Sequence, residues 1–401
     1  MVNVAVLGCG TVGSGVADVF RMNSSLIAKQ AGREIRVKYI LDIRDLSGTP
    51  YEELQIRDFA LIESDPEISV VVESIGGAGI AYEFTKRALA AGKSVVTSNK
   101  ELVATHGDEL LRLARENNVS YLFEASVGGG IPLIDPISRC LTANDLTEVC
   151  GILNGTTNYI LTKMIREGIS FKLALKQACD NGYAELDPTD DIEGKDACRK
   201  ICILASLLSG RHIRPEQSFV QGITGVSLSD VKFAESANYK IKLLGRALRT
   251  DEGRWAVWVS PHLVPASNPL SCVEDVFNAI LVSGNAVDDV MFYGRGAGKM
   301  ATASAVVSDV IDIVASAPRV LNDFWDGDGS DITCDSAAIP SKWYIRTNDQ
   351  SLAAALSGQT VLRNTSAKAS EAAFITKKAY NRQALDTLIG RTVPLSLMRV
   401  L

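Results

Sequence analysis

The densest group of ionisable side chains in the sequence lies in residues 182–200. Five aspartates and glutamates fall between Glu185 and Glu193, and the helix expected after them carries Asp196 and Lys200. Residues four positions apart share one face of a helix, so this carboxylate and this amine would be neighbours beside the apolar stripe. A lysine amine in such a place can give or take a proton. An acidic first turn with one ordinary ion pair explains the pattern equally well, and the sequence leaves both explanations open.

Few other residues could carry proton chemistry. The chain has three histidines and no H-E-x-x-H motif, and none of its eight cysteines forms a C-x-x-C pair or a Cys/His cluster with zinc spacing. Cysteines scattered over a long chain are typical of free, mostly buried thiols. If the protein is an enzyme, its lysines, aspartates and glutamates must therefore transfer the protons.

A glycine-rich turn follows the first apolar run of the chain and opens a helical pattern. Gly8, Gly10 and Gly13 form a G-x-G-x-x-G motif, with Thr11 and Val12 between the last two glycines. Such glycines permit a tight turn, a close approach of backbone to a pyrophosphate, and close packing of the helix on the strand. The helix N-terminus adds N–H groups for phosphate. The motif predicts dinucleotide binding, and an ordinary tight turn between strand and helix is the alternative.

The next β-rich run, residues 35–41, ends where such a cofactor would place its ribose. Asp42 could accept a hydrogen bond from the 2′-hydroxyl of NAD. Arg44 could instead hold the 2′-phosphate of NADP. Both residues could equally be solvated loop charges, so the pattern leaves the choice of cofactor almost even.

Two later segments also offer ligand-binding groups. Thr97, Ser98 and Lys100 follow a strand, at the edge where open α/β sheets bind their ligands; a surface lysine is the alternative. The glycine-rich segment 124–132 could ligate a hard cation through its carbonyl oxygens, although a plain hinge explains it more simply.

The polar turn at residues 154–158 precedes another expected helix. Its N–H groups and hydroxyls, including those of Gly155 and Thr156, could bind a carboxylate. The alternative is a set of N-cap residues with no ligand.

The hydrophobic pattern predicts the scaffold for these groups. Up to about residue 130, buried apolar runs alternate with helical patterns, which indicates an α/β domain with a Rossmann-like, doubly wound parallel sheet. Helices then dominate, with strand-like stretches between them, and predict a second domain of α+β character. A small-residue helix over 300–315, a polar linker over 323–331 and a tail over 342–401 complete the chain.

Composition excludes several classes of protein. The chain has 401 residues, 46% of them hydrophobic and 22% charged, as in globular proteins. Its net charge of −6 argues against nucleic acid or an anionic membrane as a partner. No apolar run approaches the ~20 residues that span a bilayer, and the first residues do not form a signal sequence. We therefore expect a cytoplasmic protein.

Together these motifs resemble the homoserine dehydrogenase family. The acidic loop with its lysine and the asparagine-rich turn are specific to that family, whereas the glycine fingerprint is not. Lys299 and Ala301 depart from the small or polar residue and the proline expected there, and Asp42 departs from the basic residue that many members carry. The matching segments occur in the family's order over roughly residues 1–316: 8–13, 97–100, 124–132, 151–159, 182–200 and 293–309.

The resemblance implies an activity and a domain organisation. The activity is NAD(P)-dependent interconversion of L-homoserine and L-aspartate 4-semialdehyde, in the synthesis of threonine and methionine. The expected domains are a nucleotide-binding domain over 1–130 with 299–318 returning to it, a catalytic and dimerisation domain over 131–298, and a small α+β tail over 342–401. That tail resembles a shortened ACT domain, for which we expect weak or no threonine inhibition. A homodimer or homotetramer is implied.

The resemblance also implies roles for single residues. Lys200 would be the proton donor and acceptor, Asp196 its polar neighbour, and Glu185 the partner of the substrate ammonium. The residues expected to line the substrate pocket are Tyr183, Asp191, Gly155, Thr156 and Lys100. Those expected to bind NADP or NAD are Gly8, Gly10, Thr11, Val12, Gly13, Asp42, Arg44, Thr97, Ser98, Lys100 and Gly296. A monovalent cation such as sodium would be held mainly by the backbone carbonyls of Glu124, Val127, Gly129 and Ile131.

Other functions remain as alternatives. A dinucleotide-sensing regulator without chemistry would need a DNA-binding module and a basic patch, and neither is visible. Another NAD(P)-dependent amino-acid dehydrogenase is a second alternative. Aspartate-semialdehyde dehydrogenase would need a nucleophilic cysteine with a histidine base, and no cysteine here has such a context. Between the cofactors, Arg44 favours NADP.

Overall fold

A computed structural model describes residues 1–317, 324–327, 329–364 and 370–401. Contacts between Cα atoms divide the chain into two units. The first comprises Met1–Asn144, Ser206–Arg214 and Gly294–Asp331, and the second comprises Asp145–Ala205, Pro215–Tyr293 and Ile332–Leu401. These units do not coincide with the three domains expected from the sequence, whose boundaries stay a prediction.

The first unit contains a six-stranded parallel sheet in the order β3-β2-β1-β4-β5-β6. This order, in which the chain runs outward from β1 in both directions, is that of a doubly wound dinucleotide-binding fold. The expected Rossmann-like sheet is therefore confirmed. Its strands are β1 Val2–Leu7, β2 Ile35–Leu41, β3 Gln55–Ile56, β4 Ile68–Glu73, β5 Ser94–Thr97 and β6 Tyr121–Leu122.

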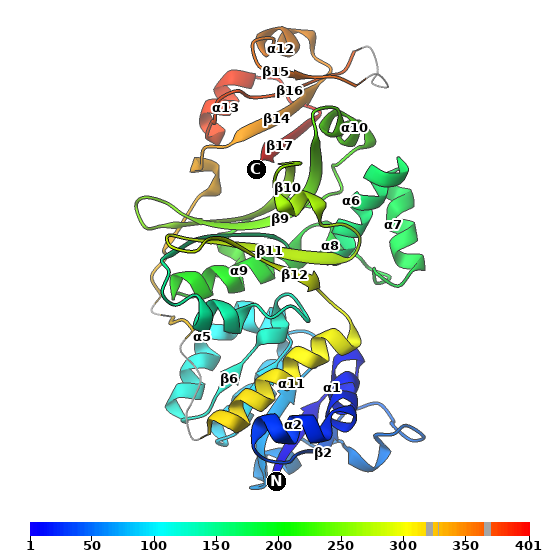
Figure 1. Ribbon diagram of the computed structural model, residues 1–401, viewed down its shortest axis with the longest axis vertical. Helices are drawn as coiled ribbons and strands as arrows, with labels where there is room; N and C mark the ends of the chain where they lie inside the picture. Colours follow the sequence, from blue (N-terminus) through cyan, green and yellow to red (C-terminus); the bar gives the residue numbers. More distant parts are fainter. Residues whose placement is uncertain (318–323, 328, 365–369) are drawn as a thin grey trace. The chain divides into compact units, whose positions relative to one another are not determined.

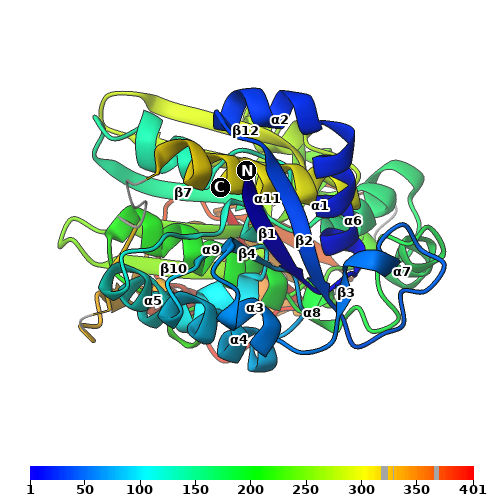
Figure 2. The same cartoon turned by 90° about the horizontal axis from the view of Figure 1, so that it is seen from below.

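Helices cover both faces of this sheet. Figure 2 shows α1 (Thr11–Met22), α2 (Ser24–Ala31) and α11 (Lys299–Ser316) on one side of β1, β2 and β4. On the other side lie α3 (Ala60–Ser64), α4 (Gly79–Ala90) and α5 (Lys100–Glu116). Small residues let α11 approach α1 closely, because a Cβ at Gly15 would lie 2.8 Å from the Lys299 carbonyl oxygen and 3.1 Å from Ala303 Cβ. The helix expected over 300–315 is thus present and packs on α1 (Figure 1).

The segment expected to be a polar linker, residues 323–331, is anchored in the first unit. Trp325 is buried, with its ring centroid 5.1 Å from that of Phe123. Asp326 accepts a hydrogen bond of 2.6 Å from Arg115. The linker interpretation is therefore wrong for these residues, while Asp323 and Asp328 lie outside the described residues.

The second unit is built on a mixed sheet with central order β12-β11-β7-β9-β10-β17. Helices α6 and α10 pack against β9. The strands are β7 Leu146–Ile152, β8 Phe219–Val220, β9 Tyr239–Arg249, β10 Trp255–Pro265, β11 Phe277–Gly284, β12 Asp288–Arg295 and β13 Thr333–Cys334. The helices are α6 Gly155–Glu167, α7 Phe171–Asp180, α8 Thr189–Ile192, α9 Lys195–Ser209 and α10 Leu228–Ser236; the last residues of α9 and β12 belong to the first unit.

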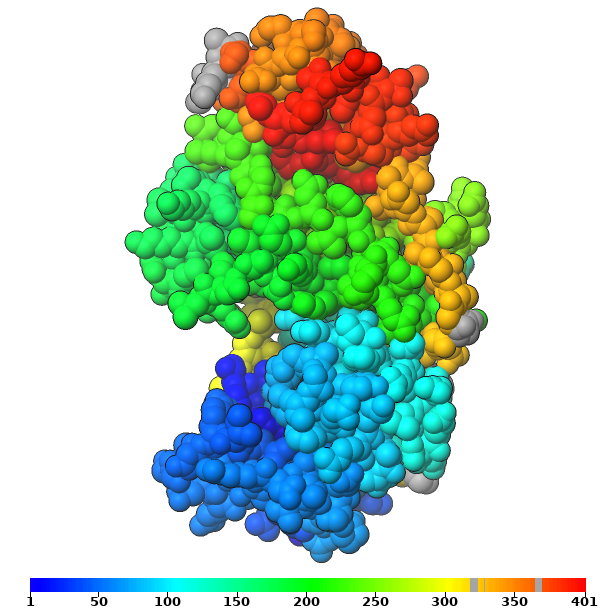
Figure 3. Space-filling model, turned by 180° about the vertical axis from the view of Figure 1, so that it is seen from behind, coloured from blue at the N-terminus to red at the C-terminus, as the bar shows by residue number. Residues whose placement is uncertain are grey.

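The C-terminal residues form a complete βαββαβ module within the second unit. Its sheet order, β17-β14-β16-β15, continues the sheet beyond β10. Figure 3 shows its orange and red residues packed against the green residues of the same unit. All six elements are short, and the expectation of a shortened ACT-like domain stays a prediction. The elements are β14 Lys342–Thr347, α12 Gln350–Ala355, β15 Thr360–Leu362, β16 Ala372–Ile375, α13 Arg382–Ile389 and β17 Ser396–Val400.

One long edge of β10 is covered by three short strands. Its other edge pairs with β9 along the full length of β10. On the covered edge, Trp255 and Ala256 pair with β13, Trp258 and Val259 pair with β8, and His262 and Leu263 pair with β17. Three strands that are far apart in the sequence thus pair with the same edge of β10.

A buried ion pair attaches the C-terminal module to α10. Asp230 is fully buried and accepts hydrogen bonds from Arg346 Nε at 2.7 Å and from the Tyr344 hydroxyl at 2.9 Å. It also forms a capping box with Ser227 at the start of α10. One carboxylate therefore neutralises a buried guanidinium and fixes a helix end.

We expect Asp230→Ala to destabilise the second unit by about 3–5 kcal/mol, because it leaves Arg346 buried with a weaker set of partners. Urea unfolding followed by circular dichroism measures this loss. The control is Asp386→Ala, which breaks the half-exposed Arg382–Asp386 pair on α13 and should cost only about 0.5 kcal/mol. Equal losses in the two variants would contradict the importance of the Asp230 contact.

Candidate active site

Lys200 and Asp196 form a buried ion pair on α9. Lys200 Nζ lies 2.7 Å from Asp196 Oδ2 and donates a second hydrogen bond of 2.8 Å to the Leu153 carbonyl oxygen. The two residues are 8% and 3% exposed, so both charges are almost out of contact with water. A Cβ at Gly245 of β9 would lie 2.8 Å from Leu153 and 3.1 Å from Ile201, so α9 and the β7–α6 turn both pack closely on the sheet. The i, i+4 spacing seen in the sequence thus becomes one fixed pair.

Asn154 connects this pair to the neighbouring elements. Its Oδ1 accepts hydrogen bonds from the N–H of Thr157 at 2.8 Å and from the Thr157 hydroxyl at 2.9 Å, and so caps α6. Its Nδ2 donates to Asp196 Oδ2 at 2.8 Å and to Asp191 Oδ1 at 2.7 Å. Sequence analysis considered an N-cap here but missed the hydrogen bonds from Asn154 to the two carboxylates, which come from residues far away in the chain.

Asp191 brings a second carboxylate to this cluster. Burial raises the pKa of Asp191, and the nearby Asp196 charge raises it further, while hydrogen bonds from Asn154 and Thr156 and the Lys200 charge oppose the shift. Asp191 lies on the short helix α8, whose last residue, Ile192, is held by a 2.8 Å hydrogen bond from the Ile223 N–H to its carbonyl oxygen. Two carboxylates and one lysine therefore share a poorly solvated region of the second unit.

The start of α6 lies beside Tyr183. The Thr156 hydroxyl donates a 2.7 Å hydrogen bond to the Tyr183 carbonyl oxygen. The Tyr183 ring lies 5.0 Å from the Tyr159 ring, centroid to centroid. A Cβ at Gly155 would come 2.7 Å from the Val276 carbonyl oxygen, so the close approach of backbone there requires glycine. The expected substrate residues Tyr183, Gly155 and Thr156 are thus brought together.

Glu185 is not brought into this cluster. It lies on the exposed loop between α7 and α8, and its carboxylate has no hydrogen bond or ion pair with any described residue. Two residues farther along, Asp187 is also exposed and caps the turn at Thr189 with a 3.1 Å hydrogen bond. The acidic run in the sequence therefore divides into an exposed part and a buried part.

In the first unit, the glycine fingerprint forms the turn between β1 and α1. Gly8 has φ +90°, a conformation that favours glycine. A Cβ at Gly13 would lie 1.8 Å from the Gly8 carbonyl oxygen, whereas a Cβ at Gly10 would meet nothing within 4 Å. Gly10 is the N-cap of α1, and Thr11 and Val12 begin the helix. Gly13 is thus required by the fold, while Gly10 leaves open space at a helix N-terminus.

Asp42 and Arg44 lie beside this turn and contact each other. Arg44 donates to both Asp42 oxygens, at 3.0 Å from Nε and at 2.6 Å from its terminal nitrogen. The Cys9 N–H donates a 2.7 Å hydrogen bond to the same carboxylate. The Arg44 guanidinium holds the pKa of Asp42 well below its usual range. The two residues that could select the cofactor are therefore one ion pair, buried at Asp42 and exposed at Arg44.

Thr97 lies at the carboxyl end of β5 and contacts Glu73, a residue that sequence analysis missed. The Thr97 hydroxyl donates a 2.5 Å hydrogen bond to Glu73 at the end of β4. Burial raises the pKa of Glu73 to about 7. Its signal in the sequence was a carboxylate that ends a buried apolar strand.

The residues after Thr97 begin helix α5. The Ser98 N–H donates to the Glu73 carbonyl oxygen at 3.4 Å. Asn99 caps α5 through a 3.1 Å bond from the Leu102 N–H, and Lys100 is the first residue of that helix. These groups lie at the carboxyl edge of the sheet, as expected.

The glycine-rich segment after Glu124 is a tight, buried turn. The Glu124 carboxylate accepts three N–H bonds, from Leu133, Ile134 and Asp135, at 2.6–2.9 Å. Burial raises the pKa of Glu124 despite these hydrogen bonds. Gly129 has φ +58°, and a Cβ there would lie 2.5 Å from the Gly296 carbonyl oxygen. Both Glu124 and Gly129 are therefore fixed by the first unit itself.

Part of that segment offers oxygen ligands. The carbonyl oxygens of Val127, Gly129 and Ile131 accept no hydrogen bond from the described residues. Val127 and Ile131 are buried. Carbonyl oxygens left unpaired on a buried turn suit a hard cation. Among the described residues no cluster of three or more His, Cys, Asp or Glu side chains could hold a metal.

The doubly wound sheet with its glycine turn and carboxyl-edge polar groups is the nucleotide-binding scaffold of nicotinamide-dependent oxidoreductases. The second unit contains a buried lysine–aspartate pair, and a lysine amine is chemically able to transfer the proton that such enzymes must move. The class defined by fold and site is therefore an NAD(P)-dependent oxidoreductase.

Comparison with known proteins gives the family. Residues 8–124 match the model described as the NAD binding domain of homoserine dehydrogenase, and residues 132–311 match the model described as homoserine dehydrogenase. The homoserine dehydrogenase of Neisseria gonorrhoeae is 42% identical over 319 residues, covering 78% of this chain and 72% of that protein. That of Bacillus subtilis is 42% identical over 318 residues, covering 78% and 73%. The chain belongs to the homoserine dehydrogenase family.

Solved structures agree with this result. A homoserine dehydrogenase from Thiobacillus denitrificans is 33% identical, with a TM-score of 0.90, over 100% of this chain and 98% of that chain. A hyperthermophilic archaeal homoserine dehydrogenase in complex with NADPH is 30% identical, with a TM-score of 0.68, over 79% of this chain and 99% of that one. The activity is thus that of an NAD(P)-dependent oxidoreductase acting on a CH–OH group, and the expected family is confirmed. In the described part of the chain, no helix has the length and apolar character to cross a bilayer.

We expect Gly13→Ala and Gly10→Ala to separate folding from cofactor binding. Gly13→Ala forces a Cβ against the Gly8 carbonyl oxygen and should destabilise the first unit by about 1–3 kcal/mol. Gly10→Ala should fold normally, because its Cβ meets nothing, yet weaken dinucleotide affinity by about tenfold, or about 1.4 kcal/mol, by obstructing the phosphate. Thermal melting and calorimetric titration measure the two effects. Wild-type affinity in Gly10→Ala would contradict a phosphate site at this turn.

Proposed function

We propose that Lys200 exchanges the proton of the substrate hydroxyl while L-homoserine and L-aspartate 4-semialdehyde are interconverted. The observation that carries this proposal is the buried Lys200–Asp196 pair, which Asn154 fixes to α6. The Leu153 carbonyl oxygen and the Asp196 carboxylate orient the amine from two directions. When bound, the nicotinamide ring supplies hydride chemistry at the carbinol carbon. Lys200 then gives or takes the matching proton at the hydroxyl oxygen.

The start of α6 is proposed to bind the substrate carboxylate. Gly155 and Thr156 are the first two residues of the helix, where N–H groups point outward and the helix dipole favours an anion. The Thr156 hydroxyl already donates to Tyr183, so the N–H groups are the donors proposed for this contact. Asp191 and Tyr183 would complete the pocket.

Glu185 is proposed to pair with the substrate ammonium. Its exposed carboxylate is free to meet a ligand, and it lies on the same loop as Tyr183, just before the helix α8 that carries Asp191. A charged contact at one end and helix N–H groups at the other would distinguish an α-amino acid from a simple alcohol.

For the cofactor we propose NADP as the preferred dinucleotide, bound at the Gly8–Gly13 turn. Arg44 is exposed beside that turn and could move from Asp42 to a 2′-phosphate. Thr97, Ser98 and Lys100 would lie along the nicotinamide side, with Lys100 between cofactor and substrate, and Gly296 would border the site.

Three further features are proposed. A monovalent cation such as sodium would be held by the carbonyl oxygens of Glu124, Val127, Gly129 and Ile131, a set that suits a hard ion. A homodimer or homotetramer is supported by exposed Met291 and Tyr293 on the outermost strand, β12. We also propose a cytoplasmic protein, without nucleic acid or membrane partners.

We expect Lys200→Ala to lower kcat by ~10² or more, the usual loss for an acid–base group, with cofactor affinity near normal. Stopped-flow and steady-state assays with aspartate semialdehyde and NADPH measure the loss, and circular dichroism checks the fold. The control is Lys195→Ala, an exposed lysine of the same helix. If turnover stayed near that of wild type, Lys200 would have no place in the mechanism, and a sensor without chemistry would be favoured.

We expect Glu185→Gln to raise KM for homoserine by about tenfold while leaving KM for the cofactor unchanged, because only the charged contact to the ammonium is lost. Glu193→Gln, in the same acidic loop, is the matched control. Unchanged affinity for homoserine in Glu185→Gln would make Glu185 an ordinary loop residue.

We expect Asp42→Ala to increase the ratio of kcat/KM for NADP over NAD by about tenfold, because it removes a carboxylate that repels the phosphate and releases Arg44. Steady-state kinetics with each cofactor measure the ratio, and Asp45→Ala is the control. A wild type that strongly prefers NAD, and loses that preference in Asp42→Ala, would show that Asp42 binds the ribose instead.

A further inference from the structure

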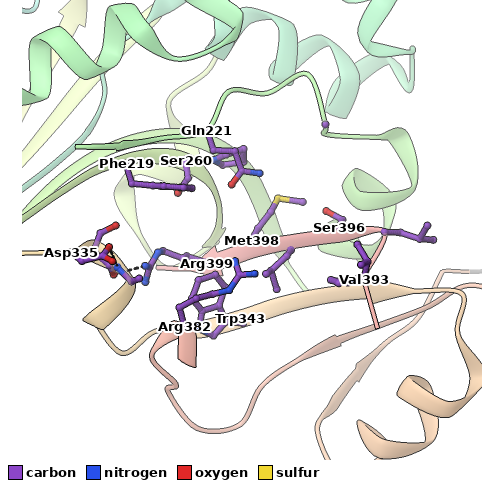
Figure 4. A pocket seen from close by; sticks show the side chains of 17 residues that line it. Phe219, Gln221, Ser260, Asp335, Trp343, Arg382, Val393, Ser396, Met398 and Arg399 are labelled. Atoms are coloured by element: carbon purple, nitrogen blue, oxygen red, sulfur yellow. Dashed lines mark hydrogen bonds between the residues drawn. The ribbon is translucent and has the colours of Figure 1, made fainter. Parts of the chain in front are cut away.

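The second unit contains a cavity of about 420 Å³, and none of the residues proposed for catalysis or cofactor binding lines it. Its walls come from β8, β10, β14, α13 and β17. The cavity therefore lies between the C-terminal module and the strands β8 and β10 of the same unit. Figure 4 shows the side chains from these elements converging. Phe219 comes from β8 and Ser260 from β10, whereas Trp343, Arg382 and Arg399 come from the C-terminal module.

Arg399 is a buried cation in the wall of this cavity. It is 5% exposed, and its guanidinium donates to the Ser336 carbonyl oxygen at 2.7 Å, to the Ile339 carbonyl oxygen at 3.2 Å and to the Ser341 hydroxyl at 2.5 Å. Its central carbon lies 4.6 Å from the Trp343 ring. All of these partners are neutral, and in the described part of the chain no carboxylate forms an ion pair with Arg399.

The charges around Arg399 compensate it only in part. Asp335 lines the same cavity, and its carboxylate acts favourably on the Arg399 charge without forming an ion pair with it. The positive charge of Arg246 repels that of Arg399, and Arg246 is itself paired with Glu148 at 2.6 Å. His262, the partner of Arg399 in the β10–β17 register, is fully buried, and burial lowers its pKa to about 3, so it is neutral. Arg382 adds a second cation at the rim, with its Nε 2.8 Å from Asp386. A buried positive charge without a directly paired carboxylate costs free energy that a bound anion would recover.

Ser260 is the second observation that points to a ligand. It lies on β10, is 4% exposed, and lines the cavity. Its hydroxyl oxygen has no hydrogen-bond partner among the described residues. An unsatisfied buried hydroxyl costs about 1–3 kcal/mol unless a ligand or water completes it.

The remaining lining is mixed. Phe219, Trp343, Leu397 and Met398 contribute rings and alkyl groups, while Asp335 contributes a carboxylate. The cavity therefore combines two guanidinium groups, one carboxylate and a hydroxyl donor with apolar surfaces, in a space large enough for a molecule of amino-acid size. Inorganic phosphate would satisfy only the charge, and a neutral apolar molecule only the apolar surfaces.

We propose that this cavity binds a small organic carboxylate with an apolar body, whose carboxylate faces Arg382, Arg399 and Ser260. This site is separate from the dehydrogenase chemistry, and nothing in its argument depends on the roles of Lys200 or the cofactor. A purely structural role for Arg399 would account for its three oxygen contacts. It would not account for the Ser260 hydroxyl, which has no hydrogen-bond partner among the described residues, or for the cavity beside it.

The test is calorimetric titration and thermal melting of the full chain with five probes. L-Leucine and 4-methylpentanoate carry both the carboxylate and the apolar body; leucinamide lacks the carboxylate; phosphate lacks the body; L-threonine has a polar body. We expect the first two to bind and to raise the melting temperature by mass action at about 10 mM, and the other three not to bind. No binding by the first two, or equal binding by phosphate, leucinamide or L-threonine, would overturn the proposal.

Variants locate the binding. Arg399→Met could fail to fold, so the test rests on Arg382→Gln and Ser260→Ala. Arg382→Gln should weaken 4-methylpentanoate about tenfold or more through loss of a charge-assisted contact, whereas Arg391→Gln, an exposed arginine outside the cavity, should not. Ser260→Ala should leave the ligand-free protein at least as stable as wild type yet weaken the ligand. Unchanged affinity in both cavity variants would place the bound carboxylate elsewhere.

Discussion

The side-chain amide of Asn154 is the constraint on which the catalytic half of the structure depends. One end of the amide caps α6, and the other end holds the carboxylates of both Asp191 and Asp196. A buried ion pair persists only when its geometry is good and its remaining lone pairs are satisfied. Because Asn154 meets this need, Lys200 can be kept away from water without being displaced from its position. The same amide holds the start of α6 against Asp191 of α8, so the groups proposed for proton transfer and for substrate binding share one anchor.

In the first unit, too, one side chain has two structural roles. The Asp42 carboxylate accepts the Cys9 N–H inside the glycine turn as well as the Arg44 guanidinium. A residue that could read the ribose therefore also stabilises the loop that would receive the phosphates. If Asp42 takes part in cofactor preference as proposed, a substitution there acts on the shape of the turn as well.

Local patterns in the sequence predicted what local physics determines. The spacing of Gly8, Gly10 and Gly13 predicted the β1–α1 turn, and the four-residue spacing of Asp196 and Lys200 predicted their contact. The roles of Asn154 and Glu73 were missed, because each depends on partners far away in the chain, Asp196 for the first and Thr97 for the second. Helix α12 and strand β15 were missed because both are short. Packing against the rest of the module, including the pairing of β15 with β16, determines their structure. Trp325 was read as linker because only the packed structure shows the Phe123 ring that buries it.

The covering of β10 by three short strands has a consequence for how this protein stays in solution. A strand of eleven residues with one open side is a template for pairing with another chain. Here β13 and β17, both from the C-terminal part, occupy two of the three covered stretches. With β8, these strands leave β10 without a long unpaired edge at which another chain could add. Removing the chain from β13 onward would expose two of the three covered stretches to pairing with another molecule.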